Sequence, residues 1–193
     1  MTKTLFLFAI AMIVGGCGMK QSSLALYTLQ AHTIEKVSSS SKYREKSIKV
    51  MQPQSLKEKI SQKIYFSYSP TLQGSYQNSQ WSNDLGKILQ GTFIQTIQES
   101  GLFKGVVSYA STAQADYRLE STVFDFSHRV RGDASHAVVS IDFALVSTQT
   151  GKLVKSKRFS YKEATKTTNA EGYVEASNRA MERLGRDLLA WLR

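Results

Sequence analysis

Apolar and polar residues alternate along several segments of this chain, and each such segment predicts a β-strand. The clearest alternation covers residues 137–145, where every second residue is apolar, as in a half-buried strand. A longer strand is predicted within residues 115–131, and its apolar phase changes near Val123, which indicates a β-bulge. Apolar and aromatic runs predict further strands, the first of them buried, at residues 24–29, 47–51, 63–68, 105–109 and 153–161.

A segment in the middle of the chain has apolar residues at steps of three and four, the spacing of one helical face. Its stripe begins at Trp81 and ends before Gly101, a residue type that commonly ends helices. Ser79 or Ser82 is placed to cap the start. Residues 76–80 are interpreted as the lead into this helix.

The last segment of the chain has the same spacing, with an apolar stripe from Tyr173 to Trp191. Thr168 and Glu171 have the form of a capping box, which predicts the helix start. Strands, helix, strands and helix therefore follow one another along the chain. This order predicts an α+β fold, in which a mainly antiparallel sheet has two long helices packed on one face.

The N-terminal residues indicate export and a lipid anchor. Lys3 precedes an apolar run over residues 5–14, which is shorter than the roughly 20 residues of a membrane-spanning helix and is typical of a secretory signal. The run leads into Val14-Gly15-Gly16-Cys17, which resembles a bacterial lipobox, and Cys17 is the only cysteine. We predict cleavage before Cys17 and a diacylglyceryl group on its thiol.

These signals divide the chain into a lipoprotein signal peptide, a lipidated tether and a single domain, at residues 1–16, 17–23 and 24–193. A buried CH₂ group contributes about 0.8 kcal/mol, so two acyl chains supply on the order of 20 kcal/mol of membrane binding. Gly18 is not the aspartate that retains lipoproteins at the inner membrane under the enterobacterial sorting rule. We therefore expect an outer-membrane protein that faces the periplasm, with no cofactor besides the lipid on Cys17.

Hydrophobic residues make up 41% of the chain, which is typical of a folded domain, and its formal net charge is +10. Removing Lys3, the only charged residue of the signal peptide, leaves +10 − 1 = +9. Export argues against nucleic acid as a partner, so the charge either serves an anionic membrane or acidic protein, or merely aids solubility.

Basic residues crowd the predicted strand at residues 153–161 and its flanks. On one interpretation they contact lipid headgroups or a partner; on the other, they are solvated and guard an edge strand against pairing. The candidates for these contacts are Lys152, Lys155, Lys157, Arg158 and Lys162.

Patterns typical of enzymes are absent from the sequence. It has no Gly-x-Ser-x-Gly elbow and no phosphate loop ending in Gly-Lys-Ser/Thr. His128 and His136 flank the Gly132-Asp133 turn, where a hairpin could bring them together to bind a metal, although polar residues at hairpin ends are usually only solvated. We expect a protein that is not an enzyme, with neither catalytic residues nor a metal site.

Several aromatic residues precede the first predicted helix. They either pack in the core or line a lipid groove or partner interface. The cluster comprises Tyr65, Phe66, Tyr68, Tyr76 and Trp81.

Short motifs follow Cys17 in a fixed order: Leu-Tyr-Thr-Leu at 26–29, Ile-Tyr-Phe-Ser-Tyr at 64–68, Glu-Ser-Gly-Leu-Phe at 99–103, Ala-Asp-Tyr-Arg-Leu at 115–119, Thr-Gly-Lys at 150–152 and Leu-Ala-Trp-Leu at 189–192. Together they resemble the ABC-type transport auxiliary lipoprotein family. Its members, such as the PqiC group, accompany MCE-type lipid-transport systems. The resemblance covers nearly the whole mature chain.

This resemblance implies a non-catalytic lipoprotein that docks a periplasmic conduit at the outer membrane. Its partners would be an MCE-type protein, an inner-membrane permease and an ATPase, its cargo phospholipid or a similar hydrophobic molecule, and it could form a homo-oligomer. Only Cys17 carries over as a functional residue. The alternative is an assembly or regulatory envelope lipoprotein with a similar small α+β domain, such as an activator of cell-wall synthesis.

Overall fold

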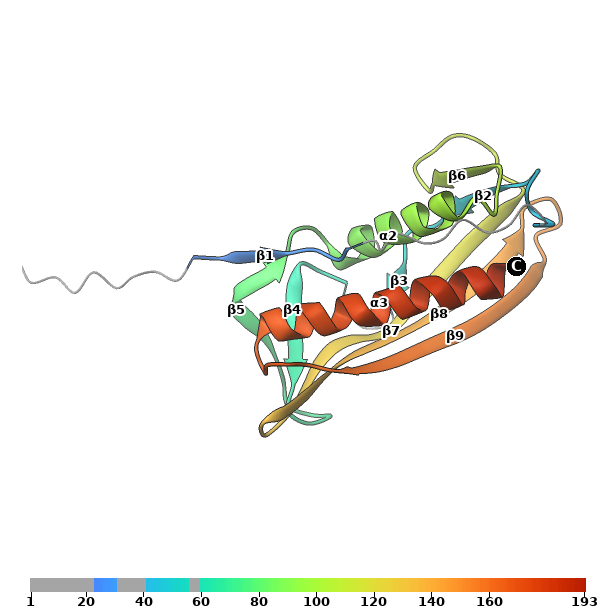
Figure 1. Cartoon of the computed structure of the whole chain (residues 1–193). Coiled ribbons are helices and arrows are strands. Elements are labelled where there is room, and N and C mark those ends of the chain that lie inside the picture. Colours follow the sequence, from blue (N-terminus) through green and yellow to red (C-terminus); the bar gives the residue numbers. More distant parts are fainter. Residues whose placement is uncertain (1–22, 31–40, 56–59) are drawn as a thin grey trace, which may run out of the picture.

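The computed structural model describes residues 23–30, 41–55 and 60–193 (Figure 1). Its described part contains one mixed sheet of nine strands and two α-helices. In chain order these are β1 (Ala25–Tyr27), β2 (Ser47–Val50), β3 (Gln54–Ser55), β4 (Lys63–Ser67), β5 (Gln73–Trp81), α2 (Leu85–Ser100), β6 (Gly105–Ser108), β7 (Tyr117–Arg131), β8 (Ala134–Ser147), β9 (Leu153–Ala164) and α3 (Ala170–Leu192).

The sheet is organised around β7. On one side β8 pairs antiparallel with β7 along its whole length, and β9 pairs antiparallel with β8. On the other side β2, β3 and β4 follow one another along β7, all parallel to it. β6 extends the sheet from β2, while β5 and then β1 extend it from β4. β1, β6 and β9 therefore lie at sheet edges.

This topology confirms the α+β prediction and shows that the sheet is mixed rather than uniformly antiparallel. The long hairpins are antiparallel, because short turns join them. The parallel pairs join strands that are far apart in sequence, such as β2 and β7, between which α2 lies. Apolar alternation predicts a strand without indicating the direction of its neighbour.

The predicted bulge in β7 is confirmed. Val123 lies opposite Ile141 and Asp125 lies opposite Ser140, so Phe124 has no partner of its own in the ladder. This extra residue shifts the alternation of side chains by one position. The core residue that follows Val123 is therefore Phe126 rather than Asp125.

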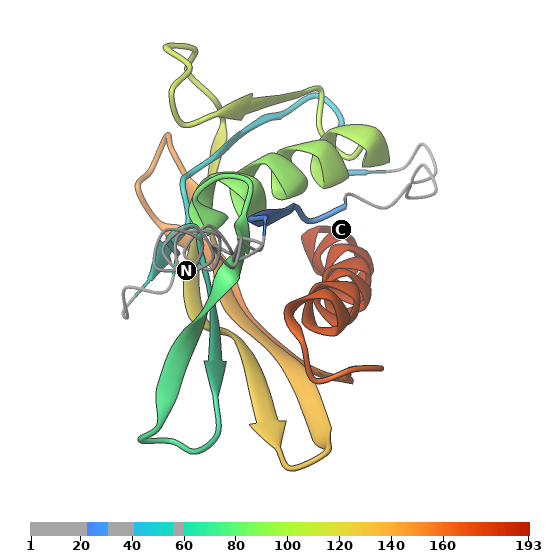
Figure 2. The ribbon, with the colours of Figure 1, turned by 90° about the vertical axis from the view of Figure 1, so that its left-hand side faces the viewer.

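Both helices pack on the same face of the sheet (Figures 1 and 2), as predicted. Phe143 of β8 contacts Phe93 of α2, with ring centroids 5.0 Å apart. Phe159 of β9 contacts Trp191 of α3 at 6.3 Å, and Phe143 and Phe159 lie 6.0 Å from each other. The core thus forms between two helices and one face, and in the described residues the other face carries no helix.

The structure corrects the prediction for residues 76–80, which belong to β5 rather than to a lead into the helix. The same correction applies to Trp81, which is the last residue of that strand and lies buried in the core. The residues of β5 are mostly polar, and they form a strand because β1 and β4 supply backbone partners on both sides.

The helix ends show where capping was predicted well and where it was not. Asp84, rather than Ser79 or Ser82, is the N-cap of α2, and its side chain makes no capping hydrogen bond. Gly101 ends α2 with φ of 67°, as its position predicts. Asn169, rather than Thr168, caps α3: its side-chain oxygen accepts a hydrogen bond from the Gly172 N–H at 2.9 Å.

The first predicted strand exists, but it is not buried. β1 lies at a sheet edge, and 59% of Leu26 is exposed. Of its apolar neighbours, Leu29 reaches the core, whereas Leu24 is exposed. An apolar run therefore predicts the strand but not its place in the sheet.

Candidate functional site

The five basic candidates lie on or beside β9, which divides them between two faces. Lys155 and Lys157 lie opposite core-facing residues of β8, on the face that the helices cover. Arg158 and Lys162 point to the other face, and Lys152 precedes the strand. Alternation along a strand therefore separates residues that form a single cluster in the sequence.

Two of these candidates are held by contacts within the protein. Lys155 donates a hydrogen bond to the backbone oxygen of Trp191 at the end of α3, where a cation also interacts favourably with the helix dipole. Burial, and then the charge of Lys42, lower the pKa of Lys155. Arg158 donates two hydrogen bonds to Asp142, at 3.0 and 2.9 Å, and its guanidinium lies 3.6 Å from the Phe124 ring centroid.

The remaining three, Lys152, Lys157 and Lys162, make no ion pair with any described residue. The ammonium of Lys157 lies 5.0 Å from the centroid of the Phe159 ring. Lys157 is thus the candidate on the helix-covered face whose charge is available to a ligand.

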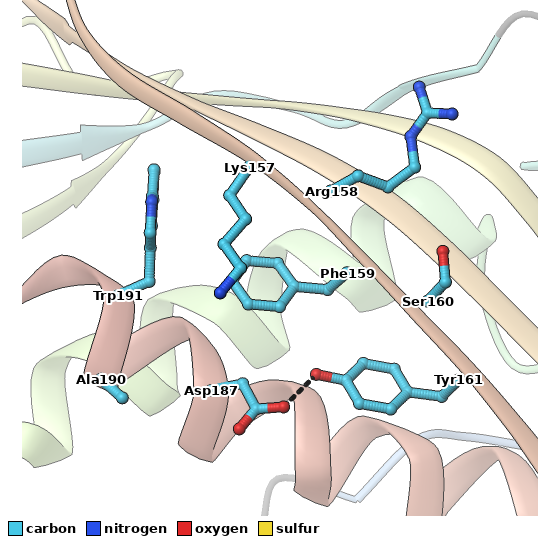
Figure 3. Close-up of a pocket in the computed structure, with 8 residues that line it drawn as sticks. All are labelled: Lys157, Arg158, Phe159, Ser160, Tyr161, Asp187, Ala190 and Trp191. Atoms are coloured by element: carbon cyan, nitrogen blue, oxygen red, sulfur yellow. Dashed lines mark hydrogen bonds between the residues drawn. The ribbon is translucent and has the colours of Figure 1, made fainter.

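Lys157 borders a groove of about 460 Å³ between β9 and the C-terminal half of α3 (Figure 3). Phe159 forms its floor, and Ala190 and Trp191 come from the helix. Across the groove the Tyr161 hydroxyl donates a hydrogen bond of 2.6 Å to Oδ2 of Asp187. Burial, followed by this hydrogen bond, raises the pKa of Tyr161, so the phenol stays protonated.

The sequence did not predict this groove. Asp187 lies on the exposed side of α3 and is unremarkable in the helical pattern, and its partner Tyr161 comes from β9. The signal available in the sequence was Trp191, a large aromatic residue at the end of the apolar stripe, which the structure shows to be half-buried.

A larger groove of about 980 Å³ lies at the start of β2 and β7. Charged residues that line it are engaged in contacts within the protein. Asp116 accepts hydrogen bonds from the Ser47 N–H at 2.8 Å, the Ser47 hydroxyl at 2.9 Å and Lys46 Nζ at 3.1 Å. These bonds, the Ser47 backbone first, lower the pKa of Asp116 to about 2. Arg118 is similarly paired, with Glu120.

The aromatic cluster predicted ahead of α2 mostly packs inward. The rings of Phe66 and Tyr76 lie 5.0 Å apart, and Trp81 contacts Phe126 at 5.9 Å in the core. Tyr68 differs, because 55% of it is exposed. Core packing is therefore the interpretation that the structure supports for the inner part of this cluster.

His128 lies inside the domain rather than in solvent, contrary to the prediction for polar residues at this hairpin. Its Nδ1 lies 2.8 Å from the Tyr76 hydroxyl, and its ring stacks on Tyr173 with centroids 5.2 Å apart. Burial, and then the charge of His136, lower its pKa to about 4.

The two histidines point to opposite faces of the hairpin, because Ala137 is the residue opposite His128 and Arg129 is the residue opposite His136. Among the described residues there is no group of three or more His, Cys, Asp or Glu that could hold a metal ion.

A family model described as the ABC-type transport auxiliary lipoprotein component matches residues 27–188. This chain belongs to that family. The prediction made from the ordered motifs is thereby confirmed.

Solved structures show the same fold as this auxiliary lipoprotein. A protein from Xanthomonas campestris superposes with a TM-score of 0.76 at 17% identity, covering 86% of this chain and 94% of its own. An uncharacterized protein superposes with a TM-score of 0.68 at 16% identity, covering 89% of this chain and 99% of its own. A comparison with curated protein sequences finds no match.

Cys17 and the predicted tether up to residue 22 lie outside the described residues of this auxiliary lipoprotein. In the part that the structure describes, neither helix combines the length and apolar character needed to cross a membrane. Lipidation at Cys17 stays a prediction.

Proposed function

We propose that this chain is a non-catalytic, outer-membrane component of an ABC-powered MCE-type transport system for phospholipid or a similar hydrophobic molecule. It docks the periplasmic conduit at the outer membrane, while partner chains supply the permease and the ATPase. The match to the transport auxiliary family over residues 27–188 is the observation that carries this proposal. The lipobox that ends at Cys17 supports the location.

In this proposal the anchor determines where the domain acts. Residues 17–23 form a tether that spans at most about 25 Å when fully extended, at roughly 3.6 Å per residue. The domain therefore works close to the periplasmic surface of the outer membrane. Its edge strands β1, β6 and β9 offer backbone groups for pairing, either with the conduit or with further copies in a homo-oligomer.

Co-purification tests the proposal. The full chain, with an affinity tag at its C-terminus, is expressed in its own bacterium, extracted in mild detergent and analysed by mass spectrometry. We expect an MCE-type protein, a permease and an ATPase to be recovered together. Recovery of cell-wall synthesis enzymes without any of these three would instead support a regulatory envelope lipoprotein.

The Cys17→Ser variant tests the anchor separately. Without the thiol no diacylglyceryl group can be attached, so the variant should be soluble or unprocessed, and mass spectrometry should find acyl groups only on the wild-type N-terminus. Unchanged membrane extraction of the variant would contradict the lipid-anchored location.

A further inference from the structure

The groove between β9 and α3 places opposite charges on the two sides of an aromatic floor. The Lys157 ammonium lies over Phe159 and has no carboxylate within ion-pair distance among the described residues. On the helix side, the exposed Asp187 accepts the Tyr161 hydrogen bond through Oδ2, and its Oδ1 accepts no hydrogen bond from the described residues. Figure 3 shows both side chains directed into the same groove.

We propose that this groove binds the phosphoethanolamine headgroup of a phospholipid. The phosphate pairs with Lys157, and the primary ammonium of the ethanolamine donates a hydrogen bond to Asp187. Phe159, Ala190 and Trp191 provide apolar contact for the glycerol and the adjoining acyl carbons. The inference rests on the proposed function, in which phospholipid is the cargo.

The two charges favour a zwitterion over a simple anion. A ligand with a phosphate alone gains from Lys157 but brings its negative charge towards the Asp187 carboxylate. A choline headgroup carries a cation without N–H groups, so it cannot donate a hydrogen bond to Asp187. Phosphatidylethanolamine satisfies both sides of the groove.

Apolar residues of the groove favour a lipid over the free headgroup. Phe159, Ala190 and Trp191 line it, and they can contact glycerol and acyl carbons that the free headgroup lacks.

Binding is measured by titrating the lipidated full chain in detergent with short-chain phosphatidylethanolamine and following tryptophan fluorescence. Trp191 lines the groove, whereas Trp81 is buried in the core and gives a constant background. We expect phosphatidylethanolamine to bind at least fivefold more tightly than phosphatidylglycerol of the same chain length. Free phosphoethanolamine should bind more weakly than the lipid.

Two variants assign the charges. Lys157→Gln should weaken binding of phosphatidylethanolamine about fivefold, the effect of one basic residue near a lipid phosphate. Asp187→Asn should remove the preference over phosphatidylglycerol, while its amide oxygen can still accept the Tyr161 hydrogen bond. Lys162→Gln, on the opposite face of the same strand, is the matched control and should bind as the wild type does.

Three results would each overturn this assignment: equal binding of the two lipids by the wild type, equal effects of the Lys157 and Lys162 variants, or free phosphoethanolamine binding as tightly as the lipid. Both lysines are exposed, so neither substitution opens a cavity in the core. Loss of headgroup preference with intact co-purification of the MCE-type partner would refute the groove alone. Intact headgroup preference without co-purification of the MCE-type partner would refute the transport partnership alone.

Discussion

Phe143 connects α2 to the sheet and, through Phe159, lies next to the contact with α3, and its replacement by alanine tests that arrangement. The ring is 1% exposed and packs against Phe93 of α2 and Phe159 of β9. A buried Phe→Ala substitution removes apolar contacts and leaves a cavity, at a cost of about 3–5 kcal/mol. In a domain of this size each kcal/mol lowers Tm by about 2–4 °C, so we expect a decrease of about 6–20 °C.

Urea unfolding followed by circular dichroism gives the free energies of unfolding. The double variant with Phe93→Ala supplies a mutant cycle, in which the two rings should show a coupling of about 0.5–1.5 kcal/mol. Phe124→Ala, at the bulge on the open face, is the control and should cost less because Phe124 is only half-buried. A cost for Phe143→Ala no larger than that control, or additive effects at positions 93 and 143, would refute this account of the core.

Three further predictions concern capping and titration. Asn169→Ala should destabilise the domain by about 0.5–2 kcal/mol in urea unfolding, whereas Thr168→Ala should have little effect. A larger loss of stability in Thr168→Ala than in Asn169→Ala would instead show that Thr168 caps α3. Folding lowers the pKa of His128 from 6.5 to about 4, so its contribution to stability is complete above pH 6.5 and is lost as the pH falls towards 4. His128→Phe should therefore flatten the dependence of Tm on pH between these values. An unchanged slope would contradict this. Folding lowers the pKa of Asp116 from 3.8 to about 2, so its contribution to stability is complete above pH 3.8 and is lost as the pH falls towards 2. Asp116→Asn should remove this decrease of Tm between pH 3.8 and 2. Its persistence in the variant would show that another carboxyl is responsible.

Elements with a regular apolar period could be predicted from the sequence because one of their faces is buried along its whole length. β8 alternates strictly, and α3 carries a continuous apolar stripe. β5 could not be found in this way, because its residues are largely Gln, Ser, Asn and Gly. It is a strand because β1 and β4 satisfy its backbone groups, and those partners are set by the tertiary structure.

The candidate site shows the same division between local and long-range information. Alternation along the predicted strand divides the basic residues between two faces, but which face the helices cover depends on the pairing of β9 with β8. The environment of His128 likewise depends on Tyr76, which is 52 positions earlier in the chain. Asp187 becomes part of the groove only because α3 packs against β9, where the Tyr161 hydroxyl donates a hydrogen bond to it.

The 23 residues of α3 run along the domain for about 35 Å, and β1 lies near the N-terminal end of this helix (Figure 1). The groove lies towards the other end, at Asp187 and Trp191. Because the helix and the sheet form one packed body, the distance between β1 and the groove is fixed by the fold. Under the proposed lipid anchor at Cys17, this fixed distance would set how far from the membrane the protein presents the proposed headgroup.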